Sequence, residues 1–151
     1  MATGEQLCGK WAFRELITEH LVDYLRIDLS HVGGVTETKK LASWAEAYYA
    51  ETALHCTSGH IRDLASMHVD LSILNCGIQE FGGPTTSTDR AGRAGASVLE
   101  GGYVVEGGCL VPTGGPGLGG RVNVELLAAL TPLAPSSMPR LRREDGAVTD
   151  W

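Results

Sequence analysis

Apolar and polar positions in residues 1–80 follow two alternating kinds of pattern. Helical spacing of apolar residues recurs from Phe13 to Leu21, from Thr36 through "TETKKLASWAEAYYA", and from Ile61 to Val69. Gly33 and Gly34 stand just before the second stretch and interrupt the chain that precedes it. The spacing therefore predicts three amphipathic helices.

Three short runs rich in strand-forming residues lie next to these helices. They are "VDYLRIDL" at 22–29, "ETALH" at 51–55 and the last residues of "LSILNCGIQE" at 71–80. Helix and strand thus alternate along the chain, which is the order expected of a parallel α/β sheet with right-handed crossovers.

Ionisable residues stand at the ends of the predicted elements: Glu5, Asp28, His55 and Glu80. Each has a simple structural explanation when it is taken alone. Glu5 is then a charge at a helix start, Asp28 an N-cap or turn residue, His55 a surface imidazole and Glu80 a rim charge. Their regular spacing, with one ionisable residue per β/α unit, favours a site at the carboxyl ends of the strands, where parallel α/β folds have their active sites.

Composition argues against several classes of function. The 151 residues carry a net charge of −6 without a basic stripe, which argues against nucleic acid as a partner. No apolar run of about 18 residues and no signal-peptide pattern is present, so we expect a cytoplasmic protein with no membrane partner. The four cysteines form no CxxC pair and are expected to be free, mostly buried thiols.

Five segments carry a resemblance to a known family: "GEQLCGKWAFRELI", "VDYLRIDLSHVGGVTETKKLASWAEAYY", "ALHCTSGH", "ASMHVDLSILNCGIQE" and "GGPGLGG". Together they resemble the enolase superfamily, in particular the mandelate racemase and muconate lactonizing enzyme branch and its galactonate-, mannonate- and gluconate-type sugar-acid dehydratases. The resemblance is nearly continuous over 1–83 and looser over 99–151. It implies the C-terminal part of an enzyme in which a capping domain precedes a (β/α) barrel and three carboxylates at strand ends hold Mg²⁺.

The resemblance implies a role for each of five residues. Glu5 matches the third metal-binding carboxylate, Asp28 and His55 match an Asp/His dyad, and Glu80 matches an acid that hydrogen-bonds the developing enediolate. His31 is then a candidate substrate-binding residue beside the barrel mouth, with local hydrogen bonding as the simpler alternative. These residue types suit the chemistry, since a hard cation and a carboxylate-supported imidazole favour removal of the proton α to a carboxylate. Glu80 would have to be protonated to donate a hydrogen bond.

The implied function is that of a Mg²⁺-dependent dehydratase that removes the α-proton of an aldonate and then eliminates its β-hydroxyl. His55 is either the base in the first step or the acid in the second. Racemase or cycloisomerase chemistry shares the first step, and a non-catalytic structural remnant is an alternative from a different class.

The predicted fold is therefore α/β: about three β/α units from the C-terminal part of a TIM-like barrel (1–83), followed by a loop and an irregular Gly-rich C-terminal tail (84–151). A whole barrel needs about 250 residues. We therefore expect the isolated chain to be inactive, and to self-associate or to need the missing N-terminal half of the barrel. Gly115, Gly117 and Gly120 satisfy GxGxxG, but a turn is the expected structure because no strand-to-helix context accompanies them.

Overall fold

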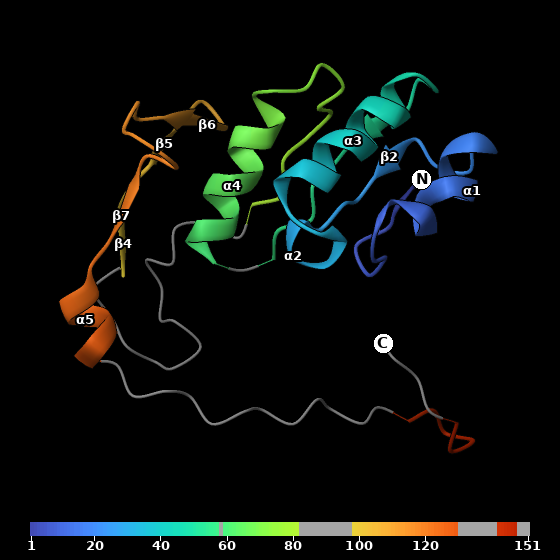
Figure 1. Ribbon diagram of the computed structural model, residues 1–151. Coiled ribbons are helices and arrows are strands. Elements are labelled where there is room, and N and C mark those ends of the chain that lie inside the picture. Colours follow the sequence, from blue (N-terminus) through green and yellow to red (C-terminus); the bar gives the residue numbers. More distant parts are fainter. Residues whose placement is uncertain (58, 82–97, 130–141, 148–151) are drawn as a thin grey trace.

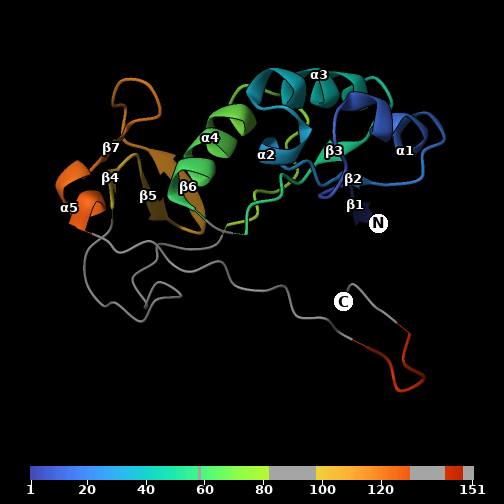
Figure 2. The ribbon, with the colours of Figure 1, turned by 60° about the horizontal axis from the view of Figure 1, so that its bottom comes forward.

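A small parallel sheet organises the N-terminal half of the chain (Figures 1 and 2). The computed structural model describes residues 1–57, 59–81, 98–129 and 142–147. The sheet contains β1 (Ala2–Thr3), β2 (Tyr24–Leu25) and β3 (Glu51–Thr52) in the order β1-β2-β3, with both neighbouring pairs parallel. A parallel bridge between Thr52 and Cys76 continues the sheet to a fourth position.

Hydrogen bonds continue the sheet beyond these two-residue strands. The backbone N–H of Arg26 donates to Thr3, and that of His55 donates to Ile27, each at 3.0 Å. The runs predicted at 22–29 and 51–55 therefore do lie side by side in parallel, although their assigned strands are much shorter than predicted. The third strand expected from the last residues of the run at 71–80 is reduced to a single parallel bridge at Cys76.

Helices cover one face of the sheet (Figure 2). The first predicted helix is a 3₁₀ turn, η1 (Lys10–Phe13), that continues into α1 (Arg14–Thr18). The other two are α3 (Val35–Glu46) and α4 (His60–Asp70), close to their predicted positions. The apolar residues that these elements bury form one core cluster: Phe13, Ile17, Val22, Leu25, Ile27, Leu29, Val32, Leu41, Ala45, Ala50, Leu54 and Val69. None of the described helices is long and apolar enough to cross a membrane.

A fourth, short helix follows β2 where the sequence predicted the end of a strand. This helix, α2 (Leu29–Val32), has Asp28 as its N-cap, and the backbone of Asp28 is still extended, with φ −95° and ψ 119°. The side chain of Asp28 accepts a hydrogen bond from the backbone N–H of Ser30, which is the usual role of an N-cap carboxylate. Asp28 therefore marks the point at which the extended chain turns into a helix.

The segment after residue 98 is not irregular, so that expectation was wrong for 99–129. Strand β4 (Leu99–Gly101) pairs antiparallel with β7 (Gly120–Val122), β5 (Tyr103–Glu106) pairs antiparallel with β6 (Cys109–Pro112), and α5 (Val124–Ala129) follows. The GxGxxG positions lie mainly in the connection from β6 to β7, in agreement with the predicted turn. The proposed boundary at 83/84 and most of the expected loop lie outside the described residues.

These antiparallel strands lie beside α4, on the side away from α1 (Figures 1 and 2). The hydroxyl of Tyr103 is 3.1 Å from His60 Nδ1, and the ring of Tyr103 packs edge-to-face on Phe81 at 5.4 Å between centroids. Gly120 lies against Leu64, and a Cβ at Gly120 would be only 2.8 Å from Leu64 Cδ1. Glycine at position 120 thus permits the close approach of β7 to α4.

Candidate active site

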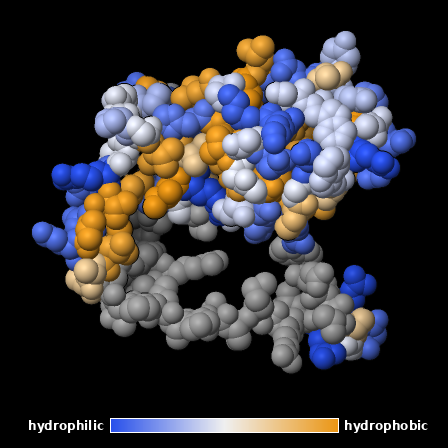
Figure 3. All heavy atoms as spheres, in the orientation of Figure 1, coloured by the Kyte–Doolittle hydropathy of each residue, from blue (hydrophilic) through white to orange (hydrophobic). Residues whose placement is uncertain are grey.

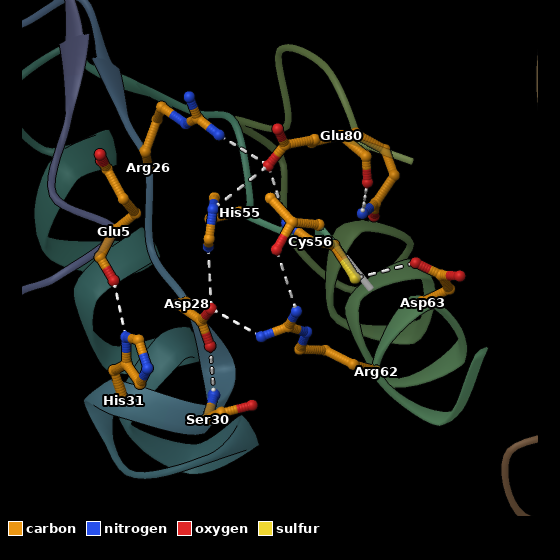
Figure 4. A network of polar contacts seen from close by, with 12 residues as sticks. Glu5, Arg26, Asp28, Ser30, His31, His55, Cys56, Arg62, Asp63 and Glu80 are labelled. Carbon is orange, nitrogen blue, oxygen red and sulfur yellow. Dashed lines mark hydrogen bonds and ion pairs between the residues drawn. The ribbon is translucent and has the colours of Figure 1, made fainter. Parts of the chain in front are cut away.

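His55 and Asp28 form a hydrogen-bonded pair at the carboxyl ends of β3 and β2 (Figure 4). His55 Nδ1 lies 2.8 Å from Asp28 Oδ2, with the Asp28 side chain fully buried and that of His55 16% exposed. An ionised carboxylate can only accept a hydrogen bond, so Nδ1 carries the proton and Nε2 is the basic atom of the neutral ring. The pair fixes both the tautomer and the orientation of the imidazole.

Two further donors hold the Asp28 carboxylate. Ser30 N–H donates to Oδ1 at 2.7 Å, and Arg62 Nη1 donates to Oδ2 at 2.8 Å. Burial alone would raise the pKa of Asp28, but the hydrogen bonds from His55 and Ser30 and the charge of Arg62 outweigh it, so the pKa is lowered. Asp28 is an N-cap and a histidine partner at once, and the two explanations weighed from sequence are compatible.

Glu80 lies on the other side of the His55 ring. Its Oε2 accepts hydrogen bonds from Arg26 Nη2 at 2.6 Å and from the backbone N–H of Cys56 at 2.9 Å, and it is 3.9 Å from His55 Nε2. Burial raises the pKa of Glu80, but the Cys56 N–H and the Arg26 guanidinium outweigh that effect and lower it. Glu80 is therefore a carboxylate that accepts hydrogen bonds, and the protonation needed for a donor role is not favoured in this structure.

One carboxylate oxygen of Glu5 lacks a hydrogen-bond partner within the described part of the chain. This oxygen, Oε2, is buried, while the main-chain carbonyl of Glu5 accepts a hydrogen bond from His31 Nδ1 at 2.9 Å. A buried oxygen of this kind suits Mg²⁺, which prefers carboxylate and water oxygens. Within the described ranges, however, no group of three or more His, Cys, Asp or Glu residues could hold a metal ion. Glu5 fits as one ligand of an incomplete set.

A cleft of about 490 Å³ opens next to Glu5, on the side of η1 and α1. Asp28, His55 and Glu80 do not contribute to its walls. Its lining residues are Thr3, Gly4, Glu5, Gln6, Leu7, Ala12, Glu15 and Leu16. The cleft is thus separate from the dyad.

Cys56 follows the candidate histidine directly but has no nucleophilic character. Its buried Sγ donates a hydrogen bond to Asp63 Oδ1 at 2.8 Å. Burial, and then the Asp63 carboxylate, raise the pKa of Cys56 to about 12, so the thiol stays protonated at neutral pH. All four cysteines are free as predicted, but Cys8, Cys76 and Cys109 are exposed, contrary to the expectation of mostly buried thiols.

The structure thus brings together three of the residues that the sequence singled out, Asp28, His55 and Glu80. Glu5 and His31 contact one another through the Glu5 main chain, and His31 thereby makes the local hydrogen bond that was the simpler of its two expected roles. Sequence reasoning missed the two arginines of the site, Arg62 beside Asp28 and Arg26 beside Glu80. Arg26 could have been found from the sequence, because it lies two residues before Asp28 in an extended run and residues i and i+2 of a strand share a face. No feature of the sequence pointed to Arg62.

Comparison with known proteins places the chain in one family. The family model for the enolase C-terminal domain-like fold matches residues 1–126. A D-mannonate dehydratase of Caulobacter vibrioides is 35% identical over 153 residues, and a D-galactonate dehydratase of Ralstonia pickettii is 34% identical over 157 residues. Both alignments cover the whole chain but only 36% and 40% of the relatives.

A solved structure gives the same result. An enolase from Pantoea ananatis with bound D-gluconate and Mg is 36% identical and superimposes with a TM-score of 0.71. The match covers 84% of this chain and 29% of that protein. The chain therefore spans between 29% and 40% of the length of these relatives. It belongs to the enolase C-terminal domain-like family, within the mandelate racemase and muconate lactonizing enzyme branch of the enolase superfamily.

Proposed function

We propose that this chain is the C-terminal part of a Mg²⁺-dependent sugar-acid dehydratase. The observation that carries the proposal is the 2.8 Å contact between His55 and the fully buried Asp28 at the ends of neighbouring parallel strands. The D-mannonate and D-galactonate dehydratases among its relatives support an aldonate as the substrate class. The net reaction removes one molecule of water from the sugar acid.

In this proposal His55 moves a proton at Nε2. Asp28 holds Nδ1–H and supports the imidazolium that forms when Nε2 takes up a proton. His55 then serves either as the base that removes the α-proton or as the acid that protonates the departing β-hydroxyl, and both roles use the same atom and the same partner. The α-proton and the hydroxyl leave together as water in the net balance.

Glu80 and His31 take supporting roles in the same proposal. Glu80 is a carboxylate held by Arg26 and Cys56, so it restrains the Nε2 side of the His55 ring and accepts hydrogen bonds from substrate hydroxyls. His31 holds the main chain of Glu5 in place. When bound, Mg²⁺ supplies positive charge that makes the α-proton of a carboxylate more acidic. Glu5 would provide one of its oxygen ligands.

The proposed catalyst needs a partner that completes the barrel. The sheet leaves Tyr24 and Glu51 exposed, and the segment around Cys76 leaves Ile78 exposed and Leu74 91% exposed. A parallel sheet is normally covered on both faces, and an open edge offers unpaired backbone groups for another strand. We propose that the remaining (β/α) units of the barrel cover these exposed residues.

Mixing experiments test this function. The chain is combined with a polypeptide that corresponds to the first two thirds of the Caulobacter vibrioides relative, and dehydration of D-mannonate, D-galactonate and D-gluconate is measured with and without Mg²⁺. We expect Mg²⁺-dependent formation of a 2-keto-3-deoxy acid. His55→Asn should abolish it, whereas His20→Asn, at an exposed position remote from the dyad, should retain it.

The alternatives give different results in the same assay. Exchange of the α-proton with solvent deuterium without loss of water would indicate racemase or cycloisomerase chemistry. A mixture that forms a stable complex but shows neither exchange nor dehydration would contradict the proposal and favour a non-catalytic structural role.

A further inference from the structure

One oxygen atom of Asp28 serves two donors. Oδ2 accepts Nδ1–H of His55 and Nη1–H of Arg62, each at 2.8 Å, while Oδ1 accepts the N–H of Ser30. The Asp28 side chain is fully buried and that of Arg62 is 19% exposed, so solvent screens this ion pair only weakly. The negative charge that supports His55 is therefore shared with a guanidinium.

His55 occupies the centre of a row of alternating charges (Figure 4). Asp28 faces Nδ1, Glu80 lies 3.9 Å from Nε2, and each carboxylate pairs with an arginine on its far side, Arg62 and Arg26 respectively. The charged and titratable groups around the imidazole come from four segments: Asp28 and His31 from the start of α2, Arg62 from α4, Glu80 from the segment after Cys76, and Arg26 from the end of β2.

Arg62 is held in this position independently of Asp28. It lies in the first turn of α4, where its N–H donates to Gly59, and its Nη2 reaches the hydroxyl of Thr57 at 3.5 Å. Thr57 belongs to the loop that directly follows His55 and Cys56. The guanidinium is therefore oriented by the same loop that carries the candidate catalytic histidine.

We propose that Arg62 is a positioning residue that tunes how tightly His55 holds a proton, because it takes up part of the charge of Asp28. If Asp28 faced His55 alone, its buried carboxylate would stabilise the imidazolium strongly, and His55 would retain the proton. A second cation on the same oxygen weakens that support and repels the imidazolium. His55 then releases a proton taken up at Nε2 more easily. A group that must both gain and lose a proton near neutral pH requires this property. This inference rests on the proposed function in assigning that proton to catalysis.

The test follows the pH titration of the His55 Cε1–H resonance in the full chain, with the resonance assigned by its loss in His55→Asn. Arg62→Gln and Arg62→Met remove the charge, and Arg62→Lys keeps it. Arg14→Gln is the matched control, since Arg14 pairs with exposed Glu15 on α1. We expect the titration midpoint to rise by about 0.5–1 pH unit in the two charge-removing variants and by less than about 0.2 unit in the other two.

Three outcomes would overturn the proposal. The first is an unchanged or lowered midpoint in a folded charge-removing variant, with near-UV circular dichroism as the measure of folding. The second is a shift in Arg62→Lys as large as in Arg62→Met, because anchoring of α4 rather than charge would then be responsible. The third is loss of the fold in both charge-removing variants, which would assign Arg62 a structural role. The midpoint is read without turnover, so absence of dehydratase activity would count against the proposed function alone.

Discussion

Asp28 performs two roles because its main chain and its side chain point in different directions. The main chain leaves the sheet and starts α2, whose first free N–H groups need an acceptor at this point. The side chain meets that need with Oδ1 and presents Oδ2 to His55 and Arg62. An N-cap thus holds the carboxylate in the orientation that the histidine requires.

Substitution of Asp28 separates the cap from the ion pair. Asp28→Asn retains a cap acceptor but leaves Arg62 without its carboxylate, and we expect a loss of about 3 kcal/mol in the free energy of unfolding. Asp28→Ala loses the cap as well and should cost about 1 kcal/mol more. Urea denaturation of both variants measures the difference. Equal stability of the two variants would contradict the capping role.

The titration of Glu80 should make the stability of the fold depend on pH. Its pKa is lowered in the folded chain, so it stabilises the fold above its ordinary value of 4.5, and that stabilisation is lost as pH falls through the lowered pKa. Arg26→Gln removes a main cause of the lowering, so the melting temperature should fall less steeply between about pH 5 and pH 3 than in the unsubstituted chain. Thermal melts followed by circular dichroism measure this slope. Arg14→Gln should leave it nearly unchanged, because its pair with Glu15 is exposed.

Single residues were predictable from the sequence where a local pattern placed them. Asp28 and His55 end consecutive extended runs, and the parallel hydrogen bond from His55 N–H to Ile27 brings the two runs into the register that joins the side chains. Arg62 was not predictable, because its contact with Asp28 depends on where α4 begins and on how that helix is rotated. Neither property follows from the apolar spacing of α4.

The β5–β6 hairpin has a sequence signal that the high glycine content of its surroundings concealed. The pair Gly107–Gly108 has φ values of 56° and 83°. Val104 and Val105 precede this pair, and Leu110 and Val111 follow it. Two residues with positive φ form the turn that a two-residue hairpin favours, and Gly-Gly between strand-forming runs is a hairpin signal. The high glycine content of the surrounding segment led instead to the interpretation of an irregular tail. The parallel strands, in contrast, followed the apolar runs closely enough to be located.

Tyr103 anchors the β5–β6 hairpin to α4, and its substitution tests how these elements are joined. Tyr103→Phe removes the hydroxyl that contacts His60 Nδ1 but keeps the ring on Phe81, so we expect a loss of about 1 kcal/mol. Tyr103→Ala removes both contacts and should expose the hairpin further. Amide hydrogen exchange of residues 103–112 should therefore accelerate slightly in the first variant and strongly in the second. Tyr49→Phe is the control, since Tyr49 is almost fully exposed, and equal acceleration in all three would refute the anchoring role.

At the scale of the molecule, apolar side chains remain on the surface in two places. Figure 3 shows them gathered over the antiparallel strands and α5, where Val105, Val124 and Leu127 are exposed. Others lie after α4, at Leu71, Leu74 and Ile78. Clustered exposed apolar side chains are typical of interaction surfaces. It agrees with the proposal that further barrel units cover the chain.

The stability of the whole chain should also depend on one buried carboxyl group, that of Asp70. Asp70 ends α4, where the helix dipole disfavours a negative charge, and both its side-chain oxygens are buried. Burial raises the pKa of Asp70 from 3.8 to about 7, although the nearby thiol of Cys76 opposes the shift. Ionising this group at neutral pH therefore works against the fold.

The sign of this effect is opposite to that of Glu80. Between about pH 4 and 7 the folded chain keeps a proton on Asp70 that the unfolded chain has released. Raising the pH through this range therefore lowers the free energy of unfolding, by up to about 1.4 kcal/mol per pH unit. Asp70→Asn has no proton to lose, so its gain in stability over the unsubstituted chain should be clearly larger at pH 8 than at pH 5. Urea denaturation at both pH values measures this difference, and Asp145→Asn, at an exposed site, should show none. An equal effect of Asp70→Asn at both pH values would mean that the carboxyl is already ionised at pH 5, so that burial does not govern its titration.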